Sequence, residues 1–300
     1  MSVEHPGVGS VPRARHAWFA TVGVVGMLWL APLPLHAHEQ WFSPNDFRLQ
    51  RDRPVSLTVR VGEGMCGEAL PYQPERAVRF LAGAKRVFDL MPVAAAGDTV
   101  WARFAPSDDD GAMLGWESNF VNHQMKRVAF ESYLVDEGLT GPLQSRRAGR
   151  DTTDGRERYR RCTKIWLTGA GGAALGAERA TRPFGFALEI VPLEVPGAAA
   201  ELPIRATFAG KPLAGVLVRV WRASFADGLT PRFCAGPRGP AQVWSGHTDA
   251  EGRITVPCRE PGQWLIGIVH MVQSTSLQDA DWESTWASLG FARAAGSSAP

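Results

Sequence analysis

The sequence lacks the short motifs that identify the common classes of hydrolase, metalloprotease and nucleotide-binding enzyme. It contains no G-x-S-x-G nucleophile turn, no H-E-x-x-H zinc motif and no glycine-rich phosphate loop. The glycine-rich stretch LTGAGGAALGAERA (residues 167–180) departs from the G-x-G-x-x-G spacing of dinucleotide-binding proteins. We therefore expect a binding protein rather than an enzyme.

An excess of charge of one sign is also missing, and long apolar runs are absent after the N-terminal region. The 32 basic and 30 acidic residues leave a formal net charge of +2, so no nucleic-acid partner is predicted. The most basic stretch, residues 144–161, has Tyr159 as its only aromatic residue and is predicted to be a solvated loop. No segment after residue 37 reaches the roughly 20 apolar residues that span a bilayer, so the mature chain is not expected to cross a membrane.

The N-terminal region has the pattern of a secretory signal peptide, which we assign to residues 1–37. Two arginines precede an apolar run at residues 17–32, and LPLHA then ends in the small residue Ala37. The alternative is an uncleaved membrane anchor, but the run is short and Pro32 interrupts it. Cleavage after Ala37 would make His38 the first residue of an exported, soluble protein.

Cysteine is scarce, and its spacing excludes a four-thiolate zinc site, because no C-x-x-C pair is present. Four cysteines in an exported chain fit two disulfides, with three possible pairings. We predict Cys234–Cys258, because these two residues are close in sequence. That choice leaves Cys66–Cys162 as the second disulfide.

Glycine and proline are plentiful, and short stretches of alternating apolar and polar residues lie between turn signals such as AGKP, DAEG and EPGQ. This pattern predicts a mainly β fold with two β-rich domains, at residues 38–188 and 189–292. The second block has the cleaner strands, which indicate a β-sandwich. The tail, residues 293–300, is predicted to be disordered.

One short helix is expected in the first domain, within residues 122–138. Val128, Tyr133 and Leu134 could share an apolar face, and Gly138 is placed to end the helix.

Several stretches, in order along the mature chain, resemble the DUF4198 family. They include AHEQWFSP, VGEGMCGEALPY, FESYLVDEGL, FAGKPLAGVLVRV and ADWESTWASLGF. The family groups exported bacterial proteins associated with nickel and cobalt uptake systems. The resemblance implies a periplasmic, mostly β protein with an Ig-like or transthyretin-like C-terminal sandwich, a role around transition metals and a membrane metal-uptake transporter as partner. Cys66 and Cys162 depart from the family's pattern, so their disulfide would be particular to this chain.

His38 is the first candidate metal ligand. At a free N-terminus its α-amine and ring Nδ1 can close a chelate ring, since their pKa values of about 7.7–8.0 and about 6.5 allow both to lose protons near neutral pH. Ni²⁺, Co²⁺ and Cu²⁺ are the expected ions, and Cu²⁺ should bind most tightly. Cleavage two residues earlier would instead place His38 third, as in square-planar Cu²⁺ and Ni²⁺ chelates, but would require Leu35 at the cleavage position. The alternative role for His38 is that of an ordinary polar residue.

His270 and Asp281 are the other candidate ligands. His270 ends the apolar strand QWLIGIVH and is either a core histidine or a ligand at the strand's edge. Asp281 follows in DADWES, which could complete a site or form a solvated loop. His247 precedes a turn and is expected to be exposed.

Three functional classes stay open at this point. The first is an exported metal-binding accessory protein for nickel or cobalt uptake. The second is a β-sandwich adhesion or carbohydrate-binding module, for which the eleven Trp residues would have to form an exposed row. The third is a copper-dependent oxidative enzyme that uses an N-terminal His.

Overall fold

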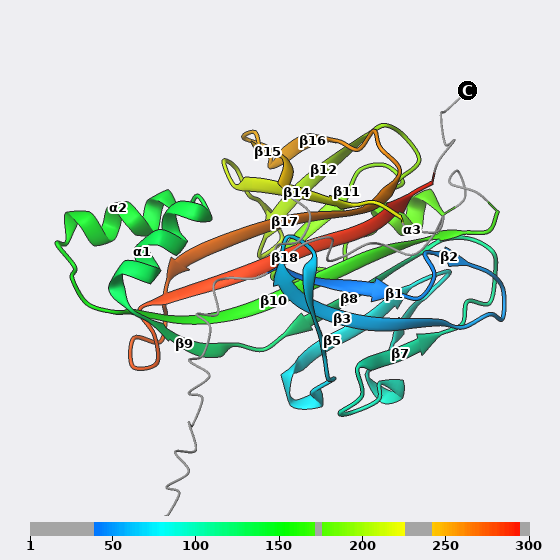
Figure 1. Cartoon of the computed structure of the whole chain (residues 1–300), viewed down its shortest axis with the longest axis horizontal. Helices are drawn as coiled ribbons and strands as arrows, with labels where there is room; N and C mark the ends of the chain where they lie inside the picture. The colour runs from blue at the N-terminus through cyan, green and yellow to red at the C-terminus, as the bar shows by residue number, and fades with distance from the viewer. Residues whose placement is uncertain (1–38, 172–175, 226–241, 295–300) are drawn as a thin grey trace, which may run out of the picture. The chain divides into compact units, whose positions relative to one another are not determined.

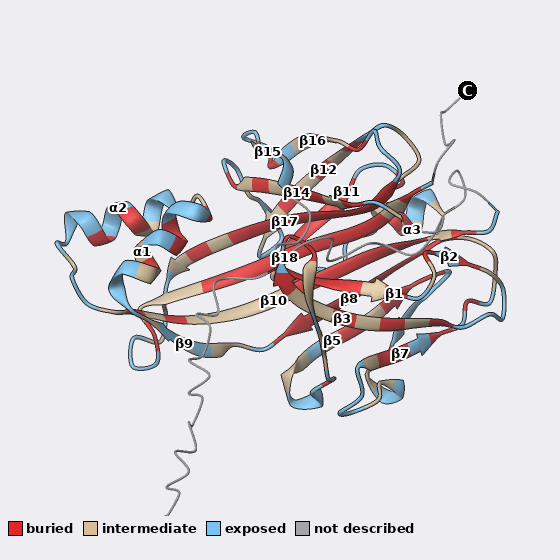
Figure 2. Ribbon diagram, in the orientation of Figure 1, coloured by how far each residue is buried: buried red, intermediate tan, exposed pale blue. Residues whose placement is uncertain are grey.

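Three long strands form the centre of the fold. They are β10 (Gly155–Gly169), β17 (Gly262–Gln273) and β18 (Trp282–Arg293). The computed structural model in which they lie describes residues 39–171, 176–225 and 242–294. β17 and β18 are buried almost continuously (Figure 2), because both faces of the sheet they form are covered.

The central strands belong to a ten-stranded sheet with the order β15-β14-β17-β18-β10-β8-β5-β6, to which β2 and β9 add by pairing with β10. β18 pairs antiparallel with β17 and parallel with β10 (Figure 1). The other members are β2 (Arg48–Leu49), β5 (Ala77–Gly83), β6 (Val87–Asp89), β8 (Ala112–Ser118), β9 (Val121–Met125), β14 (Leu217–Ala223) and β15 (Gln242–His247).

Two four-stranded sheets cover the opposite faces of this large sheet. Phe42, Leu57 and Leu114 belong to the apolar cluster on one face, and Ile204 and Ile266 to the cluster on the other. The first covering sheet contains β1 (Glu39–Pro44), β3 (Val55–Glu63), β4 (Cys66–Leu70) and β7 (Val100–Phe104). The second contains β11 (Leu188–Pro192), β12 (Glu201–Phe208), β13 (Lys211–Pro212) and β16 (Arg253–Pro257).

A helical hairpin covers the remaining part of the face on which β1 lies. Its helices are α1 (Arg127–Asp136) and α2 (Thr140–Ala148), drawn beside the ends of β17 and β18 in Figure 1. Phe130 and Leu134 of α1 cluster with Val269 of β17 and Trp286 of β18. The short elements α3 (Ala177–Thr181), η1 (Pro74–Arg76) and η2 (Met91–Val93) lie elsewhere along the chain.

The mainly β, sandwich-type fold predicted from the sequence is confirmed. The large sheet runs across the predicted boundary at residues 188 and 189, since β5, β8 and β10 precede it and β14, β15, β17 and β18 follow it. The described residues on both sides belong to one compact unit. The predicted tail begins at Arg293, which ends β18, and residues 295–300 lie outside the described residues.

The helix prediction was only partly correct. Its first residues form β9 instead, and α1 begins at Arg127. Val128 is 70% exposed and does not join the core, whereas Gly138 follows the helix with a φ of +66°, as expected of a residue that ends one. The basic stretch predicted as a loop forms the end of α2 and the start of β10 instead. Leu143 and Arg146 are the buried residues of α2.

Both predicted disulfides are wrong. Cys162 and Cys258 are free and buried, and both lie in the apolar cluster between the large sheet and the β11–β12 sheet. Their thiols contact an oxygen of Glu117 at 3.8 Å and the carbonyl of residue 256 at 3.5 Å, respectively. Cys66 is disulfide-bonded, and Cys234 lies outside the described residues.

In the part of the chain that the structure describes, no helix has the length and apolar character needed to cross a bilayer.

Candidate functional site

Strand β1 fixes the start of the described chain against the large sheet. The Ser288 hydroxyl donates to the Gln40 carbonyl at 2.6 Å, and Gln40 Nε2 donates to Thr163 Oγ1 at 3.2 Å. Both partners belong to the large sheet, to β18 and β10. The first described residue, Glu39, is therefore held in place, and its side chain is 7% exposed.

One guanidinium, that of Arg219, pairs with two buried carboxylates. Its Nη2 lies 3.3 Å from Glu39 Oε1 and donates to Glu137 Oε2. Arg219 lies between Val218 and Val220 in β14. Because side chains alternate across a strand, the two valines point into the apolar cluster and Arg219 points to the face that β1 covers.

Helix α1 supplies Glu137. This residue is the C-cap of the helix, and its backbone N–H donates to the Tyr133 carbonyl at 3.0 Å. Gly138 follows with positive φ and ends the helix there. Because α1 packs on the sheet, the Glu137 carboxylate lies next to Arg219.

A third buried carboxylate, Glu157 of β10, lies on the same face of the sheet. It accepts hydrogen bonds from the Tyr133 hydroxyl at 3.1 Å and from the Ser284 hydroxyl. Trp286 stacks on Tyr133 with ring centroids 6.0 Å apart, and its Nε1 donates to Ser284 Oγ at 3.2 Å. Ring packing and hydrogen bonds together therefore fix this carboxylate.

Arg161 completes what we call the carboxylate–arginine cluster, which consists of Glu39, Glu137, Glu157, Arg161 and Arg219. Its guanidinium lies over the rings of Tyr159, at 5.4 Å, and Trp286, at 5.6 Å. When all five groups are ionised, the cluster carries three negative and two positive charges. It therefore has one negative charge in excess.

Burial raises the pKa values of the three carboxyls in the cluster. Desolvation raises the pKa of Glu137 from its usual 4.5 to about 7, with Arg219 opposing the rise and Glu39 adding to it. Desolvation also raises the pKa of Glu39, again opposed by Arg219, and that of Glu157. Buried carboxyls with pKa values near neutrality are more frequent at functional sites than elsewhere.

A small cavity adjoins the cluster, with a volume of about 20 Å³. A space of this size can hold one water molecule. Glu39, Arg161 and Arg219 line it together with Gly267, which pairs with Arg219 in the sheet. The other lining residues are Gln40, Thr163, Ile268, Trp286, Ala287 and Ser288.

The structure does not bring His270 and Asp281 together. His270 pairs with Thr285 in β18, four residues after Asp281, which corresponds to about 13 Å along the strand. The His270 ring packs edge-on against Phe208 at 4.6 Å, and burial lowers its pKa. Asp281 forms an ion pair with Arg156 at 3.5 Å.

His270 also lies on the face of the sheet opposite the carboxylate–arginine cluster, because Phe208 belongs to β12 and Glu39 to β1. His38 lies outside the described residues. Within the described ranges, no three His, Cys, Asp or Glu side chains are grouped as a metal site requires. His247 is exposed, as expected.

The tryptophans do not form an exposed row among the described residues. Seven of them are buried: Trp41, Trp101, Trp116, Trp166, Trp221, Trp264 and Trp286. Trp244 and Trp282 are half-buried. The described part of the chain therefore lacks the exposed row of Trp residues expected of an adhesion or carbohydrate-binding module.

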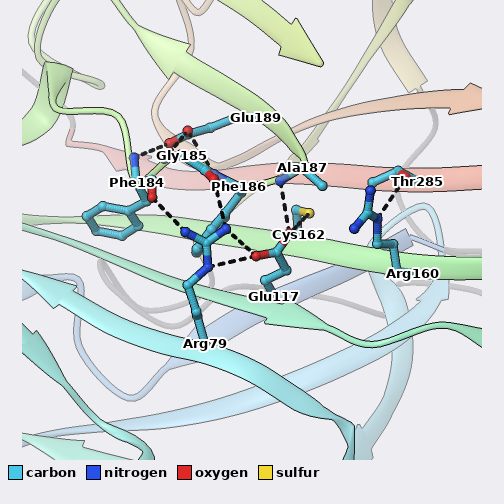
Figure 3. A network of polar contacts seen from close by, with 10 residues as sticks. All are labelled: Arg79, Glu117, Arg160, Cys162, Phe184, Gly185, Phe186, Ala187, Glu189 and Thr285. Atoms are coloured by element: carbon cyan, nitrogen blue, oxygen red, sulfur yellow. Dashed lines mark hydrogen bonds and ion pairs between the residues drawn. The ribbon is translucent and has the colours of Figure 1, made fainter. Parts of the chain in front are cut away.

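A second polar network lies on the opposite face of the large sheet and holds the loop before β11 (Figure 3). Arg79 binds Glu117, at 2.8 Å through its Nε, and also donates to the carbonyls of Phe184 and Gly185. Glu189 accepts from the backbone N–H groups of residues 184, 185 and 186 and from the buried amine of Lys164 at 2.7 Å. Protein groups occupy both oxygens of Glu189, so this network joins two sheets and we assign it a structural role.

Comparison with known proteins gives a family. The family described as "Domain of unknown function (DUF4198)" matches residues 35–272. The chain belongs to the DUF4198 family. No curated protein matches it. In this DUF4198 protein the family match includes β1, α1, β10 and β14, which supply all five residues of the carboxylate–arginine cluster.

Sequence reasoning did not find the carboxylate–arginine cluster, because its members are far apart in the chain. Two signals were nevertheless present. Arg219 interrupts the apolar strand LVRVW, and Glu137 stands directly before the glycine that ends α1. A charged residue needs a partner when it is buried, so both residues become candidates for an ion pair once the fold buries them.

Proposed function

We propose that this DUF4198 protein is an exported, periplasmic metal-binding accessory protein that hands Ni²⁺ or Co²⁺ to a membrane uptake system. Its site would be the α-amine and ring of His38 at a free N-terminus after signal cleavage, with Cu²⁺ as a competing ion. The observation that carries this proposal is the position of Glu39. This residue follows His38 directly, and its side chain is fixed in the carboxylate–arginine cluster.

Electrostatics supports a cation at this position. The cluster has one uncompensated negative charge when fully ionised, and burial makes that charge costly. A divalent ion near Glu39 would favour the ionised form of Glu137, whose pKa is about 7 without it. Metal binding should therefore release protons between pH 6 and 8, from Glu137 as well as from the amine and ring of His38.

The first test is intact-mass measurement and metal analysis of the exported protein. A mass that begins at His38, with bound nickel, cobalt or copper, is the expected result. A mass that retains residues 1–37 would rule out the N-terminal chelate.

The second test compares three variants of the mature protein by calorimetry with Ni²⁺, Co²⁺ and Cu²⁺. His38→Ala should remove most of the affinity, and Glu137→Gln should weaken binding by a smaller factor. His247→Ala is the matched control, since it deletes an exposed imidazole on β15, and should leave binding unchanged. The proposal fails if no ion binds the parent protein more tightly than about 10⁻⁵ M, roughly −7 kcal/mol.

A further inference from the structure

A groove lies between α2 and the turn end of the β17–β18 hairpin, on the same face as the helices. Its volume is about 470 Å³, within the range of small-molecule sites. Met271, Gln273 and Trp282 line it from the sheet. From the helix side it is lined by Gly141, Pro142, Ser145, Arg146 and Asp151, and Val272 lies at its edge.

The sheet side of the groove combines an aromatic ring with an amide. Gln273 and Trp282 are direct cross-strand partners, so their Cβ atoms lie about 5 Å apart on one face. Trp282 is half-buried and Gln273 is exposed. Trp282 packs in part against the apolar cluster under the helical hairpin. Its half-buried indole also lines the groove, and within the described residues no other aromatic ring stacks on it.

Three polar side chains at the groove have no hydrogen-bond partner in the described part of the chain. No hydrogen bond occupies Trp282 Nε1, the Gln273 side-chain amide or the Ser145 hydroxyl, and none of the three is a buried unsatisfied atom. Pro142, Ser145 and Arg146 lie at i, i+3 and i+4 and so share one side of α2. The groove therefore presents donors and acceptors on two walls.

The charges at the groove neutralise each other. Arg146 Nη1 lies 2.6 Å from Asp151 Oδ2, and Arg146 Nη2 donates to the Thr153 carbonyl at 2.6 Å. Asp151 Oδ1 accepts from the N–H and hydroxyl of Thr153 at 2.8 and 2.6 Å. Because Arg146 and Asp151 form an ion pair, the two residues together offer no net charge to an ionic ligand, although Arg146 Nε and Nη1 have no hydrogen-bond partner among the described residues.

We propose that this groove binds a neutral saccharide, whose pyranose ring stacks on Trp282. A pyranose has an apolar face of C–H groups and a rim of hydroxyls that both donate and accept. The indole matches the first feature. Gln273, Ser145 and Trp282 Nε1 match the second, and the internally paired Arg146 explains the preference for a neutral sugar.

The test is calorimetry and saturation-transfer NMR on the mature full-length protein. The probes are maltose, cellobiose and diacetylchitobiose, with glucuronic acid and the tripeptide Ala-Pro-Ala as comparisons. At least one neutral disaccharide should bind, and more tightly than glucuronic acid. Trp282→Ala should weaken it about tenfold, equivalent to about 1.4 kcal/mol, and Gln273→Ala about fivefold.

Two matched controls lie on β15, away from the groove. Trp244→Ala removes a half-buried indole and Gln242→Ala an exposed amide, and neither should change binding. Because Trp282→Ala removes packing against the helical hairpin, the melting temperature of each variant is measured alongside its titration. Gln273 is exposed, so Gln273→Ala tests binding without a loss of packing. The proposal is overturned if no disaccharide binds at millimolar concentration, if glucuronic acid or the tripeptide binds better, or if Gln273→Ala and Gln242→Ala have equal effects.

Discussion

Replacing Arg219 by Met tests the carboxylate–arginine cluster most severely. The substitution keeps an unbranched side chain but removes the guanidinium that Glu39 and Glu137 share. Both carboxylates are nearly buried, at 7% and 5% exposed. Removal of one partner from a buried ion pair costs about 3–5 kcal/mol. A loss at the upper end of that range is expected at pH 8, because two carboxylates lose their partner.

The loss should depend on pH in a defined direction. Arg219 lowers the pKa of both Glu39 and Glu137, so its removal raises two folded-state pKa values that burial has already raised. A carboxyl with a raised folded-state pKa binds its proton more tightly in the folded state. Stability is then highest below the unfolded pKa of about 4.5 and falls as pH rises through the folded pKa. The destabilisation should therefore be small at pH 5 and large at pH 8.

The assay is urea denaturation of parent and variant at pH 5, 6, 7 and 8, followed by fluorescence. A triple variant, Glu39→Gln with Glu137→Gln and Arg219→Met, should recover most of the stability at pH 8, because no buried charge is left unpaired. The reasoning is refuted if Arg219→Met costs less than about 1 kcal/mol at pH 8, or if its cost is the same at pH 5 and pH 8.

Three further outcomes are expected. In the parent protein, the rise of the Glu137 pKa from 4.5 to about 7 should make the free energy of unfolding fall by about 3 kcal/mol between pH 4.5 and 7. Glu137→Gln should remove most of this fall, and an unchanged pH profile would contradict the assignment. Glu189→Gln should destabilise the protein by about 3–5 kcal/mol in urea, since it leaves the buried Lys164 amine without a carboxylate; a loss below about 1 kcal/mol would be inconsistent with a structural pair. Cys162 and Cys258, whose thiol pKa values burial raises to about 12, should resist maleimide at pH 7 until the protein is unfolded, and rapid labelling of either would show that it is accessible.

Strands with clear turn signals could be predicted from the sequence. The predicted strand QWLIGIVH lies within β17, β12 ends at the turn signal AGKP, and β16 lies between the turn signals DAEG and EPGQ. These strands end at turns rich in glycine and proline, so their limits are set locally.

Two of the strands that were not predicted from the sequence, β8 and β18, are buried on both faces. Neither alternates apolar and polar residues: Gly115 lies within AMLGWES, and Ser288 and Gly290 within STWASLGFA. Period-two patterning requires one solvated face, and here both faces are covered by other sheets or by helices. The large sheet, which joins the two predicted domains, could therefore not be predicted without β8 and β18.

The carboxylate–arginine cluster could not be predicted from the sequence, and metal binding at His38 stays a prediction. The signal pattern led to His38, whereas the cluster that follows it depends on pairing between strands more than a hundred residues apart. Glu39 meets Arg219 because β1 lies over the large sheet, and Glu137 meets it because α1 packs on β17 and β18. These contacts are tertiary, and no local sequence pattern encodes them.

The central claim is that a free N-terminus at His38 binds metal beside the carboxylate–arginine cluster. The most direct measurement compares Ni²⁺ affinity, by calorimetry at pH 7.5, between the protein that begins at His38 and the same protein with one alanine added before His38. The extension moves the α-amine and keeps the imidazole and every residue of the cluster. The account predicts a loss of at least about tenfold in affinity, or about 1.4 kcal/mol. Equal affinity for the two proteins would contradict it.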